Sequence, residues 1–129
     1  MATWFDTTVL DKGLEEIALK ANSMRLLKAY AAGDSYATVD ATNTICSIAI
    51  DGADFTLENQ GANGRQQAVG AQSGVASDNS GGAPDLHIAI VDTVNSVVLA
   101  VTDETSDRDI LTSDPINVPG FNLKMNQPV

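Results

Sequence analysis

The order of polar and apolar positions predicts one helix followed by a series of strands. Thr7 or Thr8 is expected to cap the helix and Asn22-Ser23 to end it. Gly13 lowers helix propensity by about 1 kcal/mol relative to alanine, so the helix should need packing against the body or a neighbour. Apolar side chains recur at the spacing of one helix face, at Val9, Leu10, Leu14, Ile17 and Ala21.

After residue 23 the apolar side chains follow the alternation of β-strands. Asn63-Gly64 is a strong turn signal between two of these strands. The stretch from Ser73 to Pro84 is rich in Gly, Ser, Asn and Asp, which predicts a mobile loop. The strands in the first half of the chain are expected over residues 24–31, 45–50, 55–57 and 65–71.

Two runs in the second half give the clearest strand signals. In residues 86–91 apolar side chains occupy both faces, with His87 on the face shared by Ala89 and Val91. Residues 97–101 are apolar on both faces, so these two runs predict a hairpin in the centre of a sheet. Pro115 and Pro119 bound a short edge segment before a final strand over 121–126.

These elements predict a mainly β fold. We expect a small antiparallel β-sandwich or barrel preceded by one N-terminal α-helix. Residues 1–23 would form the N-terminal helical segment and residues 24–129 the β-rich body of a single compact domain.

Charge then narrows the possible partners. The 129 residues contain 7 Lys and Arg against 17 Asp and Glu, a net charge of −10. Such a surface disfavours duplex nucleic acid and anionic membranes as partners, and 5% aromatic residues are too few for base-stacking platforms. Residues 1–28 are neutral, so residues 29–129 carry the whole charge. This division suggests two differently used surfaces, although acidic residues in solvated turns would explain the charge equally well.

The chain also lacks the features of a membrane or exported protein. Its longest uninterrupted apolar run, Val97 to Val101, is far shorter than the roughly 20 residues of a membrane span. Residues 1–6 lack the basic start and apolar stretch of a signal peptide. We therefore expect synthesis in the cytoplasm, with Cys46 as a reduced thiol.

The residues able to carry chemistry favour a structural interpretation. His87 is the one histidine, with Asp85 and Asp92 near it and three serines available, but no Gly-x-Ser-x-Gly motif is present. A thiolate pair of Cys46 with His87 is the second option, although Cys46 lies inside an apolar strand typical of a core. The serines considered as nucleophiles are Ser73, Ser77 and Ser80.

Possible cation and phosphate loops are equally incomplete. Asp78-Asn79-Ser80-Gly81 lacks the later glutamate of a calcium loop, and residues 61–64 lack the lysine of a phosphate loop. The carboxylates of residues 103–109 would bind a hard cation weakly if they folded together, and otherwise form a solvated turn. We therefore expect no catalytic residues, no metal site and no cofactor.

The chain resembles a group of small structural proteins encoded by tailed bacteriophages. The opening helix with Val9-Leu10-Asp11-Lys12-Gly13-Leu14 is similar to the N-terminal segment of that group, and Asn63-Gly64-Arg65 to its central motif. Residues 86–92, with the hairpin to Val98-Leu99-Ala100, match a His-x-Ala-Leu-Val-Asp pattern. The match in chain order continues through 111–113, 118–119 and 121–128, and is weakest over 30–60.

This resemblance implies a component of the virion. The function expected first is a non-enzymatic capsid decoration, or cement, protein, made in the host cytoplasm, that binds the major capsid protein on the capsid exterior. A homo-oligomer is expected, most simply a trimer. Alternatives are a tail or head–tail joining component, a host-surface binding module, and a hydrolase built on His87. The residues expected to contact the capsid or a sister subunit are Val9, Leu10, Leu14, Ile17 and Ala21.

Overall fold

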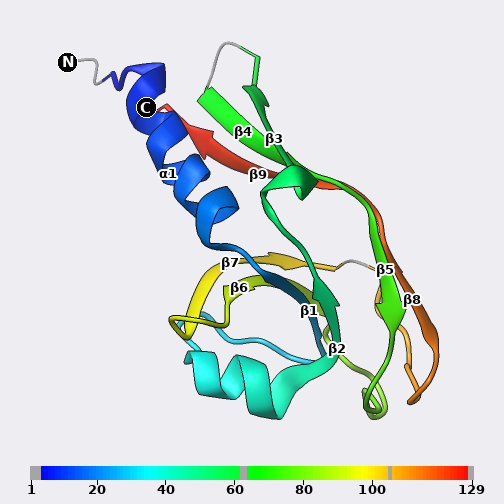
Figure 1. Cartoon of the computed structure of the whole chain (residues 1–129). Coiled ribbons are helices and arrows are strands. Elements are labelled where there is room, and N and C mark those ends of the chain that lie inside the picture. The colour runs from blue at the N-terminus through cyan, green and yellow to red at the C-terminus, as the bar shows by residue number, and fades with distance from the viewer. Residues whose placement is uncertain (1–3, 62–63, 105, 128–129) are drawn as a thin grey trace.

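The computed structural model describes residues 4–61, 64–104 and 106–127, and it confirms a mainly β fold with one N-terminal helix (Figure 1). The helix is α1 (Thr7–Lys20), and two short helical turns follow it, the π-helix η1 (Thr38–Asn43) and the 3-10 turn η2 (Gly52–Asp54). The strands are β1 (Ser23–Leu27), β2 (Thr44–Ala49), β3 (Phe55–Asn59), β4 (Gly64–Val69), β5 (Gln72–Val75), β6 (His87–Asp92), β7 (Val97–Asp103), β8 (Pro115–Val118) and β9 (Phe121–Asn126).

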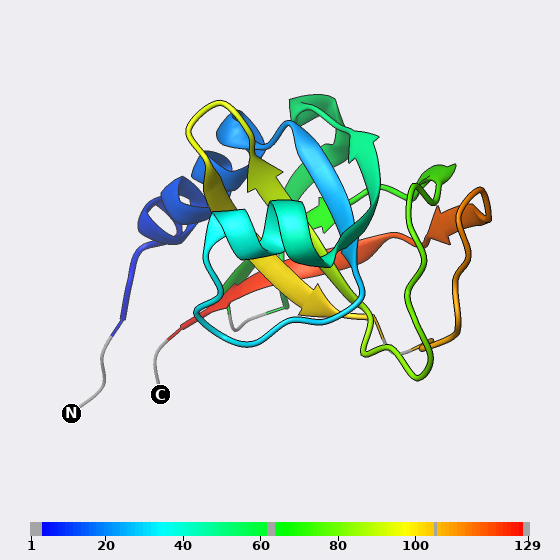
Figure 2. The same ribbon diagram turned by 90° about the horizontal axis from the view of Figure 1, so that it is seen from below.

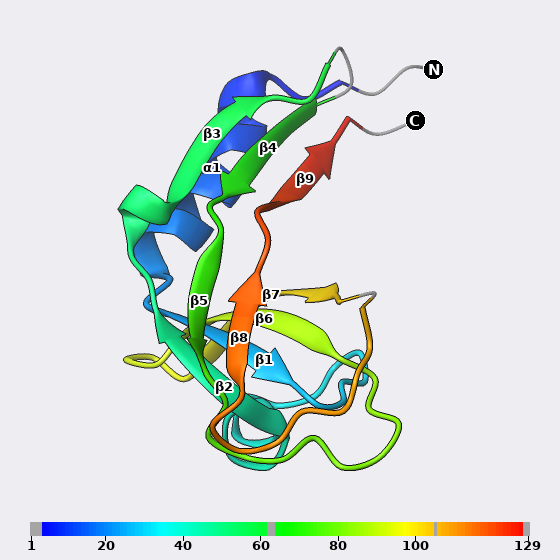
Figure 3. The same ribbon diagram turned by 90° about the vertical axis from the view of Figure 1, so that its right-hand side faces the viewer.

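All strand pairs are antiparallel, and they build two layers consistent with a small sandwich. One layer is a four-stranded sheet in the order β2-β1-β6-β7. The other contains the sheet β3-β4-β9 and the pair β5-β8. Val69 pairs with Phe121 and Gln72 pairs with Val118, so β4 with β5 and β9 with β8 run on as one bent ribbon (Figure 3).

The core has two parts, one on each face of the four-stranded sheet. The larger part includes Met24 and Ile45, and the smaller part contains Leu27, Val39 and Ala89. The π-helix η1 lies across the sheet and covers the smaller part (Figure 2). Strand β6 contributes side chains to both parts, whereas β7, the strand for which burial of both faces is expected, is mostly half-buried.

The predicted hairpin of β6 and β7 is confirmed, but its predicted position in the centre of the sheet is wrong. Strand β7 lies at the end of the sheet order, and Val97 is 42% exposed. The pairing shifts between Ile90 and Val91, so that Ile90 faces Ala100 while Val91 faces Val98. The extra residue is a β-bulge, which turns two successive side chains of β7 toward the same core. The simple alternation expected for residues 97–101 therefore fails there.

The loop expected over residues 73–84 is more ordered than its composition indicated. Its first residues belong to β5, and hydrogen bonds join the rest to the 110–114 segment. Asn79 Oδ1 accepts from the Thr112 amide at 2.8 Å, and Ser80 Oγ accepts from the Ile110 amide at 2.8 Å. In the predicted Asn63-Gly64 turn, Asn63 lies outside the described residues, but the flanking hairpin of β3 and β4 is confirmed.

Candidate functional site

The N-cap of the helix lies one residue before the first of the predicted caps. Asp6 is the N-cap, and its carboxylate accepts from the Thr8 amide at 2.9 Å. The hydrogen bonds from Thr8 lower the pKa of Asp6. An aspartate therefore caps the helix instead of Thr7 or Thr8, because a carboxylate satisfies a free amide and also interacts favourably with the positive end of the helix dipole.

The apolar stripe of the helix faces the body of its own chain. Leu10, Leu14 and Ala21 are buried, and Ile17 is half-buried. The helix lies against β3, β4 and β9, as Figure 1 shows. The expectation that this whole stripe meets a capsid or a sister subunit is therefore corrected. Of its five residues only Val9 is exposed, at 58%.

Polar contacts and one glycine fix the helix in this position. Asp11 forms an ion pair with Arg65 at 2.6 Å, and both side chains are largely shielded from water. A Cβ atom on Gly13 would lie 2.7 Å from the terminal carbon of Met125. The glycine that weakens the helix locally thus lets β9 pack closely against it, which agrees with the expected need for packing.

Exposed apolar side chains gather where the two ends of the chain meet. Trp4 is 67% and Phe5 46% exposed, and Val9 follows them in the first turn of α1. The backbone of Phe5 makes two hydrogen bonds with the side-chain amide of Gln127, at 3.0 and 2.6 Å. We call Trp4, Phe5 and Val9 the terminal patch. Gln127 follows β9 directly, so its hydrogen bonds hold Phe5 beside the end of that strand.

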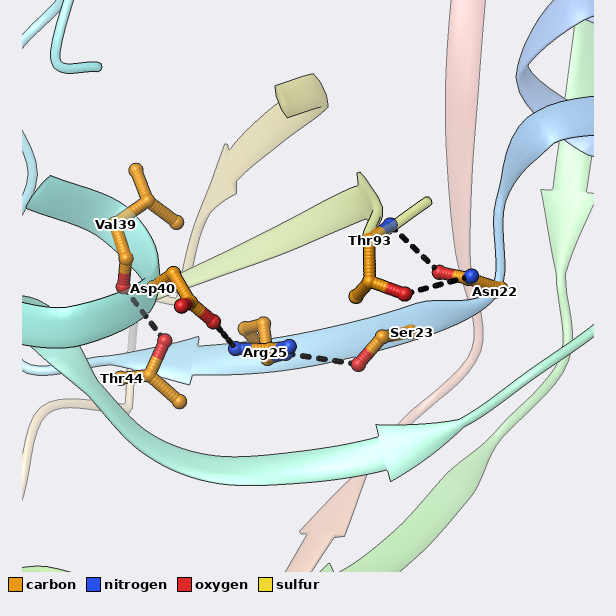
Figure 4. Close-up of polar contacts among 7 residues, drawn as sticks. All are labelled: Asn22, Ser23, Arg25, Val39, Asp40, Thr44 and Thr93. Atoms are coloured by element: carbon orange, nitrogen blue, oxygen red, sulfur yellow. Dashed lines mark hydrogen bonds and ion pairs between the residues drawn. The ribbon is translucent and has the colours of Figure 1, made fainter. Parts of the chain in front are cut away.

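Separate polar contacts tie the four-stranded sheet to η1 and to the segment after α1 (Figure 4). Arg25 pairs with Asp40 of η1 at 2.5 Å and donates to Ser23 at 2.8 Å. Asn22 and Thr93 exchange two hydrogen bonds, which tie the link after α1 to the β6–β7 turn. These contacts are all within the chain, and they position the elements relative to one another.

His87 lies among two carboxylates and an aromatic ring. Its Nδ1 is 3.0 Å from the backbone oxygen of Asp85 and 3.9 Å from a carboxylate oxygen of the same residue. Its Nε2 is 3.9 Å from a carboxylate oxygen of Asp103. The Tyr30 ring is tilted against the imidazole at 5.7 Å between centroids. The side chain of His87 is 16% exposed, so the cluster is a shallow surface site.

The other groups considered as partners of His87 do not join this cluster. Cys46 of β2 and Ile88 of β6 both pair with Leu26 of β1. His87 pairs with Leu27, the next residue of β1. Successive side chains of a strand point to opposite faces, so Cys46 and His87 lie on opposite sides of the sheet. Burial raises the pKa of the Cys46 thiol, which keeps it protonated and unreactive.

The serines and Asp92 are likewise engaged elsewhere. Ser80 Oγ donates to the Gly81 carbonyl and Ser77 Oγ to the Ile45 carbonyl, while Ser73 pairs with Asn117 in β8. Asp92 is buried in the β6–β7 turn. Hydrogen bonds, chiefly from the side chain of Asn95, lower its pKa, although its desolvation acts in the opposite direction. The described contacts of these residues therefore assemble no Ser-His-Asp triad.

The acidic segment after β7 does not converge on one cation. Asp107 accepts from the Leu86 amide at 2.9 Å, and Asp109 accepts from the Ala83 amide at 3.3 Å. Glu104 accepts from the amide two residues on. These three carboxylates hold different stretches of backbone, and Asp103 alone of the four approaches His87. Of the two expectations for residues 103–109, a joint cation cluster is therefore not formed by the described carboxylates, and Asp103 makes a cross-strand contact instead.

Comparisons with known proteins add no relative. No protein-family model, curated protein or solved structure matches the chain. Among the residues that the structure describes, no helix is long and apolar enough to cross a membrane.

Proposed function

We propose that this chain is a non-enzymatic structural protein of a tailed-bacteriophage virion, a decoration protein that binds the outer surface of the head and stabilises it. The observation that carries the proposal is the terminal patch, three exposed apolar side chains close together in the neutral first segment of a chain with a net charge of −10. The sequence resemblance supplies the setting, and the major capsid protein is the partner.

Charge supports an exterior position. Residues 29–129 carry the whole net charge of −10, so packaged DNA would repel the body. The terminal patch belongs to the neutral segment 1–28, where approach to a negatively charged capsid surface would meet no net repulsion. Tryptophan is among the residues most enriched at the energetic centres of interfaces. The patch is therefore the surface proposed to contact the capsid, in place of the buried helix stripe.

Self-association is a second part of the proposal. Strand β7 ends the sheet order, and no other described strand pairs with its outer edge. We propose that copies meet along this edge and form a trimer at three-fold positions of the head. Light scattering of the purified protein tests this part. A monomer both in solution and on particles would contradict it, and the capsid contact would then be the only interface.

Salt and heat test the capsid contact on intact particles. Virions are incubated at low and at molar salt, pelleted, and analysed for this protein relative to the major capsid protein. At 1 M salt the Debye length is about 3 Å, so exposed ion pairs weaken while buried apolar contacts persist. The proposal predicts retention at both salts, and release of DNA at a lower temperature from heads that lack the protein. Release by salt alone contradicts the apolar contact, and unchanged heat stability contradicts the stabilising role.

A matched pair of variants tests the patch itself. Val9 and Val94 are both exposed valines, at 58% and 81%, but Val94 lies in the β6–β7 turn. Val9→Asp is expected to weaken binding to particles that lack the protein by about tenfold or more, whereas Val94→Asp leaves binding unchanged. Both variants are expected to keep the wild-type free energy of unfolding, because neither side chain is buried. Equal binding by the two variants contradicts the proposed surface.

The virion alternatives differ in copy number and location. A tail or joining component, or a host-surface module, would be present in few copies at one vertex or along the tail. The described contacts give no reactive constellation around His87, so a hydrolase is the weaker candidate. His87→Ala is expected to leave the heat stability of the particle intact, apart from a small packing loss.

A further inference from the structure

We propose that His87, Asp85 and Asp103 form a binding site for one divalent transition-metal ion of the zinc class. Each residue offers one ligand atom, and the three atoms lie within 4.8 Å of one another. One imidazole nitrogen with two carboxylate oxygens is a ligand set suited to zinc, whereas calcium and magnesium prefer oxygen ligands alone. This inference stands independently of the proposed role in the virion.

The β-bulge in β7 brings the ligands together. Asp92 pairs with Val97, so an unbroken hairpin would place Thr102 opposite His87. The pairing instead skips one residue, and His87 faces Asp103. Directly opposed residues of neighbouring strands direct their side chains to the same face. Asp85 precedes His87 by two residues, which places it on that face wherever the chain stays extended.

The backbone fixes the imidazole in the state that binds metal. Nδ1 of His87 is 3.0 Å from the Asp85 carbonyl oxygen, which can only accept, so Nδ1 carries the hydrogen. In the neutral ring the lone pair is then on Nε2, the nitrogen that faces Asp103. Metal-binding histidines commonly donate their other N–H to a backbone carbonyl in this way. The Tyr30 ring packs against the imidazole and restricts its rotation.

The distances fit an ion better than direct hydrogen bonds. Nε2 lies 3.9 Å from the Asp103 carboxylate, whereas the Asp85 carboxylate lies 3.9 Å from Nδ1, so Asp85 must swing toward Nε2 to reach the same ion; both contacts exceed hydrogen-bond range. Ligand atoms about 2.0–2.1 Å from a tetrahedral zinc ion lie roughly 3.4 Å apart, so the three ligand atoms, which lie within 4.8 Å of one another, would have to draw closer around the ion. The side chains of Asp85 and Asp103 are 68% and 61% exposed, and can make these movements without disturbing the core. Two carboxylates also balance the double positive charge of the ion.

Titration of the untagged protein with Zn²⁺ tests the site. The measurements are calorimetry and the ¹⁵N resonances of the imidazole, in excess Mg²⁺ to suppress diffuse binding to the acidic surface. His87 is the only histidine of the chain, so the imidazole signal is unambiguous. Asp103→Asn removes a ligand, and Asp78→Asn is the matched control, because it makes the same charge change at an exposed aspartate.

The proposal predicts one bound Zn²⁺ per chain and a shift of the Nε2 resonance. Asp103→Asn and His87→Ala are expected to weaken binding by about tenfold or more, whereas Asp78→Asn matches the wild type. Because Asp103 is exposed, its variant should fold even if the histidine variant does not. Undiminished binding by Asp103→Asn, or an unchanged imidazole signal, would identify diffuse binding and overturn the proposal. No binding at all would leave His87 paired with carboxylates only, and would overturn it equally.

Discussion

Replacing Leu14 by alanine tests whether the helix belongs to the core of its own chain. Leu14 is 2% exposed, so the substitution removes about three carbon groups from a fully buried position. At about 0.8 kcal/mol per group the transfer term is about 2.4 kcal/mol, and the cavity left against β4 raises the expected loss to about 2–5 kcal/mol. Urea unfolding followed by tryptophan fluorescence and circular dichroism measures this loss.

Leu19 supplies the matched control on the same helix. It is 76% exposed, so Leu19→Ala is expected to change the free energy of unfolding by less than about 0.5 kcal/mol. A cost below about 1 kcal/mol for Leu14→Ala, or equal costs for the two variants, would show that the helix is not packed on the sheet as described. The stripe would then again be available as an interface.

Three further predictions concern single positions. Gly13→Ala should raise the free energy of unfolding by less than the ~1 kcal/mol usual for replacing a helical glycine, because the new Cβ meets Met125. In the Met125→Ala background the same substitution should give the full increase. Equal effects in both backgrounds would contradict the contact. The pKa of Asp92 is lowered in the folded chain, so its stabilising contribution is present at neutral pH and is lost as the pH falls through that lowered value. The difference in unfolding free energy between wild type and Asp92→Asn should therefore shrink in acid, and a difference independent of pH would count against it. Cys46 should react with a thiol reagent only at the rate of unfolding, and rapid labelling of the native chain would refute its burial.

Local patterns predicted the helices and strands well, because the spacing of apolar residues within one segment determines both its type and its buried face. The alternation around Ile88 predicted strand β6, and the spacing of Leu10 and Leu14 predicted the helix stripe. These patterns do not state which surface covers each face. A helix stripe that packs on its own sheet has the same sequence pattern as a stripe that binds a partner. For this reason the assignment of Leu10 and Leu14 to an interface was wrong.

The spacing of apolar residues predicts neither the order of strands in a sheet nor the position of a β-bulge. The apolar run of β7 looked central, yet it forms an edge, because order depends on which distant strands pair. The bulge at Leu99 then changed the partner of His87 from Thr102 to Asp103. A regular hairpin drawn from the predicted turn misses that pairing by one residue. The sequence feature that comes nearest to predicting this contact is that His87 and Asp103 lie at almost equal distances from the β6–β7 turn.

The segment between β1 and β2 was the least predictable from sequence. Arg25 and Asp40 are separated by fifteen residues and by a stretch with no clear period, so their ion pair had no local signature. The order of residues 76–84 was hidden for a similar reason, because the partners of Asn79 and Ser80 lie some thirty residues further along the chain. A Gly- and Ser-rich composition predicts an irregular backbone. It does not predict whether hydrogen bonds to distant residues keep that backbone in one conformation.

The central claim is that this protein coats the outside of a phage head, and direct imaging tests it best. A density map of the intact particle, combined with quantitative mass spectrometry of purified virions, gives both its position and its copy number. We expect copies on a scale comparable to the major capsid protein, on the outer surface, with residues 4–9 against the capsid and the acidic body in solvent. Density confined to the tail or a single vertex, a few copies per particle, or absence from the virion would contradict it.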